Sequence, residues 1–300
     1  MKRIVVFFLV LLLFAGCAPK GEAVSAPAPT ATAAPSPTPF ATNAPVQELQ
    51  VELSPAAATA TPVAVPTEAP TPEPTEAPEP TATAEPGPLS GRIIGVDPGH
   101  QLVYDPKPEP MAPNSRETKQ RTAGGTRGVR TGTYEYEVNL AVGLELRDLL
   151  QAAGAQVVLT HEVLDVNISN IERAQMFNEA NVDLGIRLHC NGNDNQKNRG
   201  CFLMVPSQNR TAFFDENVAA AKAILEAYCQ ETGLSSRYKE GITYHSNQTG
   251  FNWCTRPIVT IEMGHLTNPE EDALLSDPAF QKTMAMGLYK GILAYFEAKD

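Results

Sequence analysis

Apolar runs of strand length alternate with amphipathic segments of helix length between residues 91 and 298. Continuous apolar runs predict strands over 92–97, 155–160, 182–192 and 256–265. Apolar positions that recur every three or four residues predict helices over 136–154, 169–181, 215–232 and 278–296. Because such an alternation is typical of an α/β fold, we expect a single domain with a mostly parallel, twisted sheet and helices on both of its faces.

Local signals set the ends of several helices. Gly154 follows the first helical pattern and is a suitable C-cap. Ser169, with Glu172 three residues later, forms a capping box that starts the second helix. Asn268 and Glu270 are expected to start or cap a short helix. The last helix carries a stripe of four-residue spacing that we expect to face the core: Phe280, Met284, Leu288, Ile292 and Phe296.

The first 17 residues are typical of an export signal. Lys2 and Arg3 precede an apolar run from Ile4 to Phe14, which is too short to span a hydrocarbon core of roughly 30 Å. The following FAGC is similar to a bacterial lipobox, in which Cys17 would be lipidated after cleavage. A cleaved secretory signal without a lipid is the alternative. The lipobox predicts an exported lipoprotein tethered to the outer face of the cytoplasmic membrane.

Residues 18–90 are rich in proline, alanine and threonine. Most of the 26 prolines of the chain lie between Pro19 and Pro88, where large apolar side chains are rare. Because such a segment buries too little apolar surface to fold, we predict a disordered tether that leaves residues 91–298 as the folded domain. A proline-rich chain extends by about 3.1 Å per residue, so a membrane-anchored domain would reach the cell wall.

The net charge and the cysteines limit which partners and which disulfide bonds are expected. The net charge of -11 argues against nucleic acid as a partner. Cys190, Cys201, Cys229 and Cys254 could pair in an oxidising compartment, and their spacing contains no CxxC zinc motif. A disulfide between Cys190 and Cys201, across the intervening polar turn, is one of the pairings that stay open.

A long segment, residues 100–132, follows the first predicted strand. Its apolar residues show neither the pattern of a strand nor that of a helix. It is rich in proline, glycine and threonine and ends in the basic stretch GGTRGVRTGT. Long ordered loops in compact domains are often functional. Arg127 and Arg130 are therefore candidate contacts for substrate carboxylates, while a cover or a solvated loop are the alternatives.

Side chains that can bind a metal or move protons stand at, or just after, the ends of three of the predicted strands: His100, His189 and Glu262. Because the carboxyl ends of parallel strands meet at one edge of a sheet, we expect these side chains to lie close together. Glu135 or Glu137, where the long segment meets the first helix, is a fourth candidate. Two histidines and a carboxylate are typical ligands of a hydrolytic zinc site with one open position.

Taken alone, each histidine has a simpler interpretation as a surface or helix-capping residue. His161, His245 and His265 could replace one of the chosen pair on residue type alone. The zinc hypothesis therefore depends on the coincidence of matching strand ends, not on any single histidine.

Four blocks of the chain resemble, in order, the zinc-dependent N-acetylmuramoyl-L-alanine amidases of bacterial cell walls. These blocks are IIGVDPGH, the segment from YEYEVNL to VVLT, NISNIERAQMFNEANVDLGIRLHCNG, and PIVTIEMGHLTN with the helix that follows it. The resemblance extends from about residue 91 to about residue 297, effectively the whole predicted domain. It implies a Zn²⁺ cofactor and peptidoglycan as the substrate.

The resemblance also assigns roles to individual residues. It places zinc ligands at His100 in DPGH, at Glu135 in EYEVNL and at His189 in RLHCNG. It places the catalytic glutamate at Glu262 in VTIEMGHLTN. Glu137 is the fallback for the glutamate ligand, because only two positions separate it from Glu135.

Four further positions near these blocks have expected roles. Asn191 follows the second zinc histidine and either orients a ligand or contacts the substrate. Arg173 is expected to be structural and to pair with a carboxylate. His161 stands where members of the family often carry arginine. Cys190 replaces a small residue and should point away from the metal, because neighbours on a strand alternate between its faces.

The implied reaction is hydrolysis of the amide between the lactyl group of N-acetylmuramic acid and L-alanine, with Glu262 moving the proton. A metallopeptidase or carboxypeptidase for cell-wall peptides is one alternative. A non-catalytic wall-binding lipoprotein is another, although all four site positions are filled. The requirement for an activator protein, the oligomeric state and the role in cell separation, wall turnover, sporulation or germination stay open.

Overall fold

The computed structural model describes residues 86–300. The predicted export signal with Cys17 lies outside the described residues, as does the predicted tether except for residues 86–90. The side chain of Leu89 is fully buried and its N–H donates to the carbonyl of Ala153, so the core begins slightly before residue 91. None of the helices within residues 86–300 is long and apolar enough to cross a membrane.

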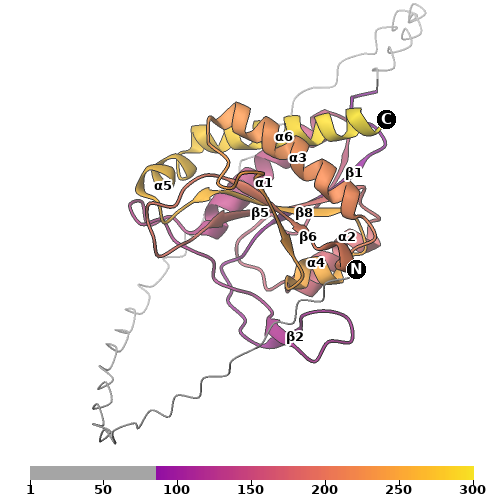
Figure 1. The fold of residues 1–300 in the computed structure, drawn as a ribbon, viewed down its shortest axis with the longest axis horizontal. Helices are drawn as coiled ribbons and strands as arrows, with labels where there is room; N and C mark the ends of the chain where they lie inside the picture. Colours follow the sequence, from indigo (N-terminus) through magenta and orange to yellow (C-terminus); the bar gives the residue numbers. More distant parts are fainter. Residues whose placement is uncertain (1–85) are drawn as a thin grey trace, which may run out of the picture. The chain divides into compact units, whose positions relative to one another are not determined.

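A six-stranded sheet forms the centre of the domain, in the order β4-β1-β5-β8-β6-β7 (Figure 1). Its strands are β1 (Ile93–Pro98), β4 (Gln156–Leu159), β5 (Leu184–Asn191), β6 (Phe202–Pro206), β7 (Ile242–His245) and β8 (Ile258–His265). The four predicted strands are β1, β4, β5 and β8, and they pair in parallel. The predicted mostly parallel sheet is confirmed.

Strands β6 and β7 extend the sheet beyond the predicted part. Strand β6 runs antiparallel to β8, and β7 runs parallel to β6, so both reverse the direction of the other strands. They have five and four residues and pair with partners distant in the sequence. Neither an alternating pattern nor a hairpin turn therefore marks them in the sequence.

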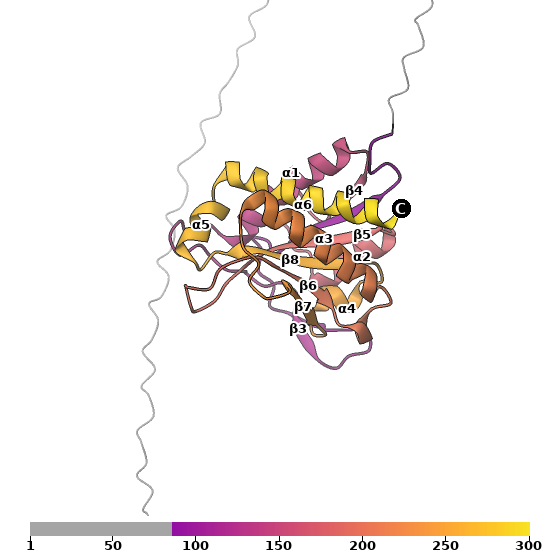
Figure 2. The same cartoon turned by 45° about the horizontal axis from the view of Figure 1, so that its top comes forward.

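Helices cover both faces of the sheet (Figures 1 and 2), as predicted. One face carries α1 (Glu135–Ala152), α3 (Phe214–Thr232) and α6 (Pro278–Lys299). The other carries α2 (Asn170–Glu179) and α4 (Thr249–Trp253). The short helix α5 (Pro269–Leu275) follows β8, and one 3-10 turn (Gln208–Arg210) precedes α3.

The main core lies between the sheet and helices α1, α3 and α6. The predicted stripe of α6 faces it, with Phe280 packed against the core and four residues buried in it: Met284, Leu288, Ile292 and Phe296. Helix α6 approaches α3 closely at Gly291, where a Cβ would clash with the backbone of Ile224. A smaller apolar cluster around Phe177 joins α2 and α4 to the sheet.

The predicted helix ends are present. Ser169 accepts a hydrogen bond from the N–H of Glu172, whose side chain accepts one from the N–H of Ser169, so a capping box starts α2. Asn268 caps α5 by accepting hydrogen bonds from its first turn. Gly154 follows the last residues of α1 with a φ of +92°, a conformation that favours glycine.

The long segment after β1 contains an antiparallel hairpin of β2 (Pro108–Pro110) and β3 (Thr118–Gln120). The hairpin lies on the side of the sheet that carries α4 (Figures 1 and 2). From α4, Trp253 Nε1 donates to the carbonyl of Pro110 at 2.9 Å, and Asn252 Nδ2 donates to that of Met111 at 3.1 Å. These two bonds hold the hairpin against α4.

The four cysteines of the described residues are free thiols. Cys190 is buried in the main core, on the face of β5 opposite to that of His189, so it points away from the candidate ligands as expected. The disulfide between Cys190 and Cys201 is not formed. Instead, Sγ of Cys201 lies 3.4 Å from Sγ of Cys229 on α3.

Candidate functional site

The turn after β1 positions the first candidate ligand. His100 has a φ of 65°, a left-handed conformation that is uncommon for a residue with a side chain and costs backbone strain. Gly99 lets the turn pass close to β5, because a Cβ there would clash with the ring of His189. Asn139 Nδ2 donates to the carbonyl of Gly99 at 3.0 Å. The turn is thereby fixed between β5 and α1.

The three predicted zinc ligands meet at the carboxyl ends of the strands. One donor atom each from His100, Glu135 and His189 lies within 4.8 Å of the other two. Oε1 of Glu135 is 3.2 Å from Nε2 of His100 and 3.0 Å from Nδ1 of His189. Within residues 86–300, this is the one group of three or more histidine, cysteine or acidic side chains close enough to hold a metal ion.

Hydrogen bonds to backbone groups orient the side chains of these candidate ligands. Nδ1 of His100 lies 2.7 Å from the carbonyl of Ala123, which can only accept, so Nδ1 carries a proton and Nε2 is the nitrogen that faces Glu135. Glu135 accepts hydrogen bonds from the N–H of Thr126 at 2.8 Å and of Cys190 at 3.1 Å. Burial raises the pKa of Glu135, but the two facing imidazoles lower it well below its ordinary value, so the carboxylate is ionised.

This donor set fits zinc. Two imidazole nitrogens and one carboxylate oxygen are a common protein shell of catalytic zinc sites, which keep a further position open. The bond from His100 to the carbonyl of Ala123 is the outer contact that fixes the tautomer of a metal-binding histidine. Burial lowers the pKa of His189, which favours the neutral form that binds metals.

The other candidates do not join this group. The side chain of Glu137 accepts a hydrogen bond from the N–H of Tyr134 at 2.8 Å and caps α1, so Glu135 and not Glu137 faces the histidines. The three remaining histidines lie elsewhere, with His161 beside Arg173, His245 bonded to Thr243 on β7, and His265 buried near Glu271.

A buried ion-pair cluster fixes the end of β1 next to this group. Asp97 is fully buried and accepts hydrogen bonds from Nε of Arg187 at 2.8 Å and from Nη1 of Arg173. Burial raises the pKa of Asp97, but the two guanidinium groups lower it far below its usual range. Arg173 also donates to the carbonyls of Pro98 and His100 at 2.9 and 3.1 Å. Arg173 therefore pairs with a carboxylate, as expected, and positions the turn of His100.

His161 packs against this cluster and should make the stability depend on pH. Burial, with the charge of Arg173, lowers the pKa of His161 from 6.5 to about 4. Between these values the unfolded chain binds a proton that the folded chain does not, so acidification destabilises the fold. The expected loss is on the order of 2 kcal/mol as the pH falls from about 6.5 to 4.

The variant His161→Gln removes this titration. Denaturant unfolding of both chains across this pH window should show a smaller loss of unfolding free energy in the variant than in the wild type. Comparing the two curves cancels the groups that titrate in both chains. Equal losses would show that His161 is not held neutral by the fold.

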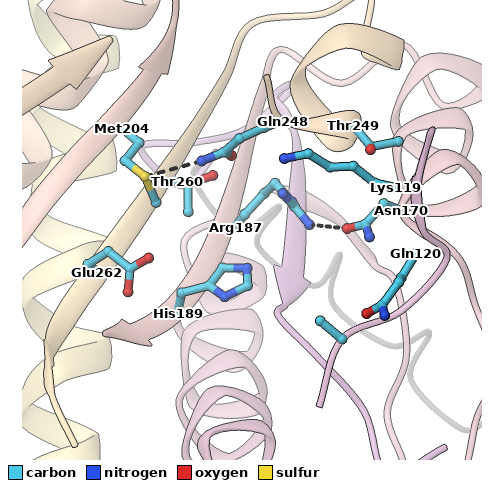
Figure 3. A pocket seen from close by; sticks show the side chains of 11 residues that line it. Lys119, Gln120, Asn170, Arg187, His189, Met204, Gln248, Thr249, Thr260 and Glu262 are labelled. Atoms are coloured by element: carbon cyan, nitrogen blue, oxygen red, sulfur yellow. Dashed lines mark hydrogen bonds between the residues drawn. The ribbon is translucent and has the colours of Figure 1, made fainter. Parts of the chain in front are cut away.

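A cavity of about 420 Å³ opens beside the metal-binding group (Figure 3). Its floor includes two rows of side chains on one face of the sheet, Arg187 beside Thr260 and His189 beside Glu262. Neighbouring strands lie about 4.8 Å apart, so Glu262 is one strand spacing from His189. Figure 3 shows both of these side chains at the same end of the cavity.

Glu262 is suited to proton transfer. Burial raises its pKa well above the ordinary value, and the charge of Glu135 adds to this effect while Arg187 opposes it. Among the described residues, none provides a hydrogen-bond partner for its Oε2. A buried carboxyl group with a raised pKa and a free oxygen, facing a cavity, is a candidate for general acid–base work.

The three candidate substrate contacts do not line this cavity. The guanidinium of Arg127 lies over the ring of Tyr134, 4.6 Å from its centroid. Arg130 is exposed, and its backbone N–H donates to Asp272 at 2.6 Å. Asn191 is the last residue of β5 and is half-buried. Contact of these three residues with substrate stays a prediction.

Other lining residues are not marked by any motif in the sequence. They come from β3, α2 and the start of α4 (Figure 3): Lys119, Gln120, Asn170, Gln248 and Thr249. Their places depend on how distant segments pack together. Arg187 does carry one signal, because a charged residue inside an apolar strand indicates a buried ion pair.

Several proteins of known name are similar to this chain in sequence. The family model described as N-acetylmuramoyl-L-alanine amidase matches residues 94–294. A germination-specific N-acetylmuramoyl-L-alanine amidase of Bacillus subtilis is 30% identical over 230 residues, which cover 70% of this chain and 82% of the relative. An N-acetylmuramoyl-L-alanine amidase of Mycobacterium tuberculosis is 25% identical over 214 residues, covering 69% of this chain and 87% of the relative.

Solved structures share the fold. An N-acetylmuramyl-L-alanine amidase of Mycobacterium smegmatis has a TM-score of 0.64 at 23% identity, over 70% of this chain and 99% of that one. The CwlD amidase of Clostridioides difficile, solved in complex with the GerS lipoprotein, has a TM-score of 0.55 at 22% identity, over 69% and 100%. Since the family model spans well over half of the sequence and every residue of the site, this chain belongs to the N-acetylmuramoyl-L-alanine amidase family.

Proposed function

We propose that this chain is a zinc-dependent hydrolase that cleaves the amide between the lactyl group of N-acetylmuramic acid and L-alanine in peptidoglycan. The observation that carries the proposal is the meeting of His100, Glu135 and His189 beside Glu262 in a chain of this family. The names of the relatives support the choice of bond. The donor set supports the choice of metal.

The three ligands would hold the ion where β1 and β5 end and α1 begins. When bound, zinc supplies Lewis-acid chemistry that polarises an amide carbonyl and acidifies water. The chain contributes orientation, because backbone groups of Ala123, Thr126 and Cys190 hold the ligand side chains in place. A site that is ordered in advance needs little reorganisation during the reaction.

Glu262 carries the proton in the proposed reaction. Its Oε2 accepts the proton of the attacking water and passes it to the departing nitrogen of L-alanine. Its Oε2, one strand spacing from His189 and without a hydrogen-bond partner among the described residues, is free to hold that proton until the nitrogen takes it. The products are a glycan with a free lactyl carboxylate and a stem peptide with a free amino terminus.

Product analysis tests this function. The chain is incubated with purified peptidoglycan and zinc, and the products are identified by mass spectrometry. We expect stem peptides that begin with L-alanine, and we expect none from His189→Ala, while His245→Ala, outside the metal-binding group, serves as the matched control. Cleavage within the stem peptide would favour the metallopeptidase alternative. Zinc binding without any cleavage would favour the wall-binding alternative.

The amino terminus supports a second proposal, on location. An export signal with lipidation at Cys17 would anchor the chain to the outer face of the cytoplasmic membrane, and residues 18–90 would carry the domain to the cell wall. The support is the residue pattern alone. Mass spectrometry of the amino-terminal peptide from membranes should find a lipid on Cys17. An unmodified terminus produced by cleavage at another position would contradict the proposal.

A further inference from the structure

The end of the cavity away from Glu262 is positively charged. Lys119 and Arg187 both line it (Figure 3). Arg187 shares Asp97 with Arg173, so two guanidinium groups face one ionised carboxylate and one positive charge is left over in a buried cluster. Among the described residues that line the cavity, Glu262 is the only acid, and it lies beside His189 at the other end.

Lys119 brings a second charge from the hairpin. Its strand β3 pairs with β2, and the hydrogen bonds from Trp253 and Asn252 of α4 to the end of β2 hold the hairpin in place beside the cavity. Within residues 86–300, the ion pairs of lysines involve other side chains, and Lys119 pairs with no carboxylate.

Neutral polar groups complete this end of the cavity. The amide side chains of Gln120, Asn170 and Gln248 line it. Oδ1 of Asn170 accepts a hydrogen bond from Nη2 of Arg187 at 2.9 Å and its Nδ2 donates to a backbone carbonyl, so Asn170 orients the guanidinium. Oγ1 of Thr249 is buried and has no hydrogen-bond partner among the described residues. Two cations surrounded by amide and hydroxyl groups, in a chain of net charge -11, are suited to bind an anion through charge-assisted hydrogen bonds.

We propose that Lys119 and Arg187 form a subsite for a carboxylate of the leaving peptide, the free α-carboxylate of the second stem residue. This inference rests on the proposed function, which places the scissile amide beside His189. Positions two apart on a strand are about 6.7 Å apart, which is the offset of Arg187 from His189. In an extended peptide, the scissile nitrogen and that carboxylate are about 6 Å apart. The preferred substrates are therefore muramoyl peptides with isoglutamate, not isoglutamine, in second position.

Two substrates that share the scissile bond test the subsite: muramoyl-L-alanyl-D-isoglutamate and muramoyl-L-alanyl-D-isoglutamine. The wild type should show a kcat/KM about tenfold higher for the acid than for the amide, and added salt should reduce this ratio. Lys119→Met should bring the ratio close to one, whereas Lys119→Arg should retain it. Lys107→Met, an exposed lysine of the same segment outside the cavity lining, should keep the wild-type ratio.

The subsite is overturned if the wild type cleaves both substrates equally well, or if Lys119→Met keeps the wild-type ratio. Failure of the proposed amidase function gives a different result, since neither substrate is then cleaved. In that event, calorimetry measures the binding of L-alanyl-D-isoglutamate and L-alanyl-D-isoglutamine and so tests the subsite without any cleavage. Tighter binding of the acid, lost in Lys119→Met, supports the subsite, and equal binding of the two dipeptides overturns it.

Discussion

Glu262→Gln should lower kcat by about 10²- to 10⁴-fold, the range expected when a general acid–base is removed. Glutamine keeps the size and shape of glutamate but does not relay a proton. The carboxyl group it replaces lies one strand spacing from His189, has a raised pKa, and has one oxygen without a hydrogen-bond partner within residues 86–300. Steady-state kinetics on a muramoyl-L-alanyl peptide would measure the effect.

The same variant should fold and bind metal normally, because Glu262 lies outside the group of three ligands. A neutral amide is also easier to bury than an unpaired carboxyl group, so the unfolding free energy should not fall. Glu179→Gln, at an exposed position of α2, is the matched control and should retain wild-type kcat. A Glu262→Gln chain with more than about a tenth of wild-type kcat would exclude this carboxyl group from proton transfer.

Asp97→Ala should destabilise the fold by about 3 to 5 kcal/mol, because it leaves two buried guanidinium groups without their shared carboxylate. Arg173 and Arg187 are both buried, and Asp97 is fully enclosed between them. The loss should also loosen the turn that carries His100, since Arg173 donates to its carbonyl. Denaturant unfolding near neutral pH would measure the change in free energy.

Asp148→Ala is the matched control for this experiment. Asp148 also pairs with an arginine, but on the exposed surface of α1, where its side chain is 61% exposed. A surface ion pair contributes about 1 kcal/mol or less, so the control should change stability little. An Asp97→Ala chain that loses no more than the control would show that the buried cluster does not hold β1 in place.

The part of the site that could be predicted from the sequence consists of residues at the ends of strands. His100, His189 and Glu262 could be predicted to meet because the carboxyl ends of parallel strands share one edge of a sheet. The family resemblance placed the ligand at Glu135 with Glu137 as the fallback, whereas spacing alone could not separate them, since both lie in the first turn of α1. The direction of that turn points Glu135 inward and lets Glu137 cap the helix at Tyr134.

The remaining features depend on contacts between distant segments. Strands β6 and β7 are short and join the sheet in the reverse direction, so the sequence pattern of parallel units does not include them. Lys119 reaches the cavity because a hairpin is bonded to α4, more than a hundred residues further along the chain. No local propensity encodes such a contact, whereas the α6 stripe, which depends only on helical spacing, could be predicted completely.

The most direct test of the account is a zinc titration in which metal content and activity are measured on the same preparation. After removal of metal by a chelator, cleavage of the muramoyl-L-alanine bond should return in proportion to added zinc and saturate at about one ion per chain. Separate replacement of His100, Glu135 and His189 by alanine should abolish both the tight zinc site and the activity. Full activity in the metal-free chain, or tight zinc binding that survives all three replacements, would contradict the account.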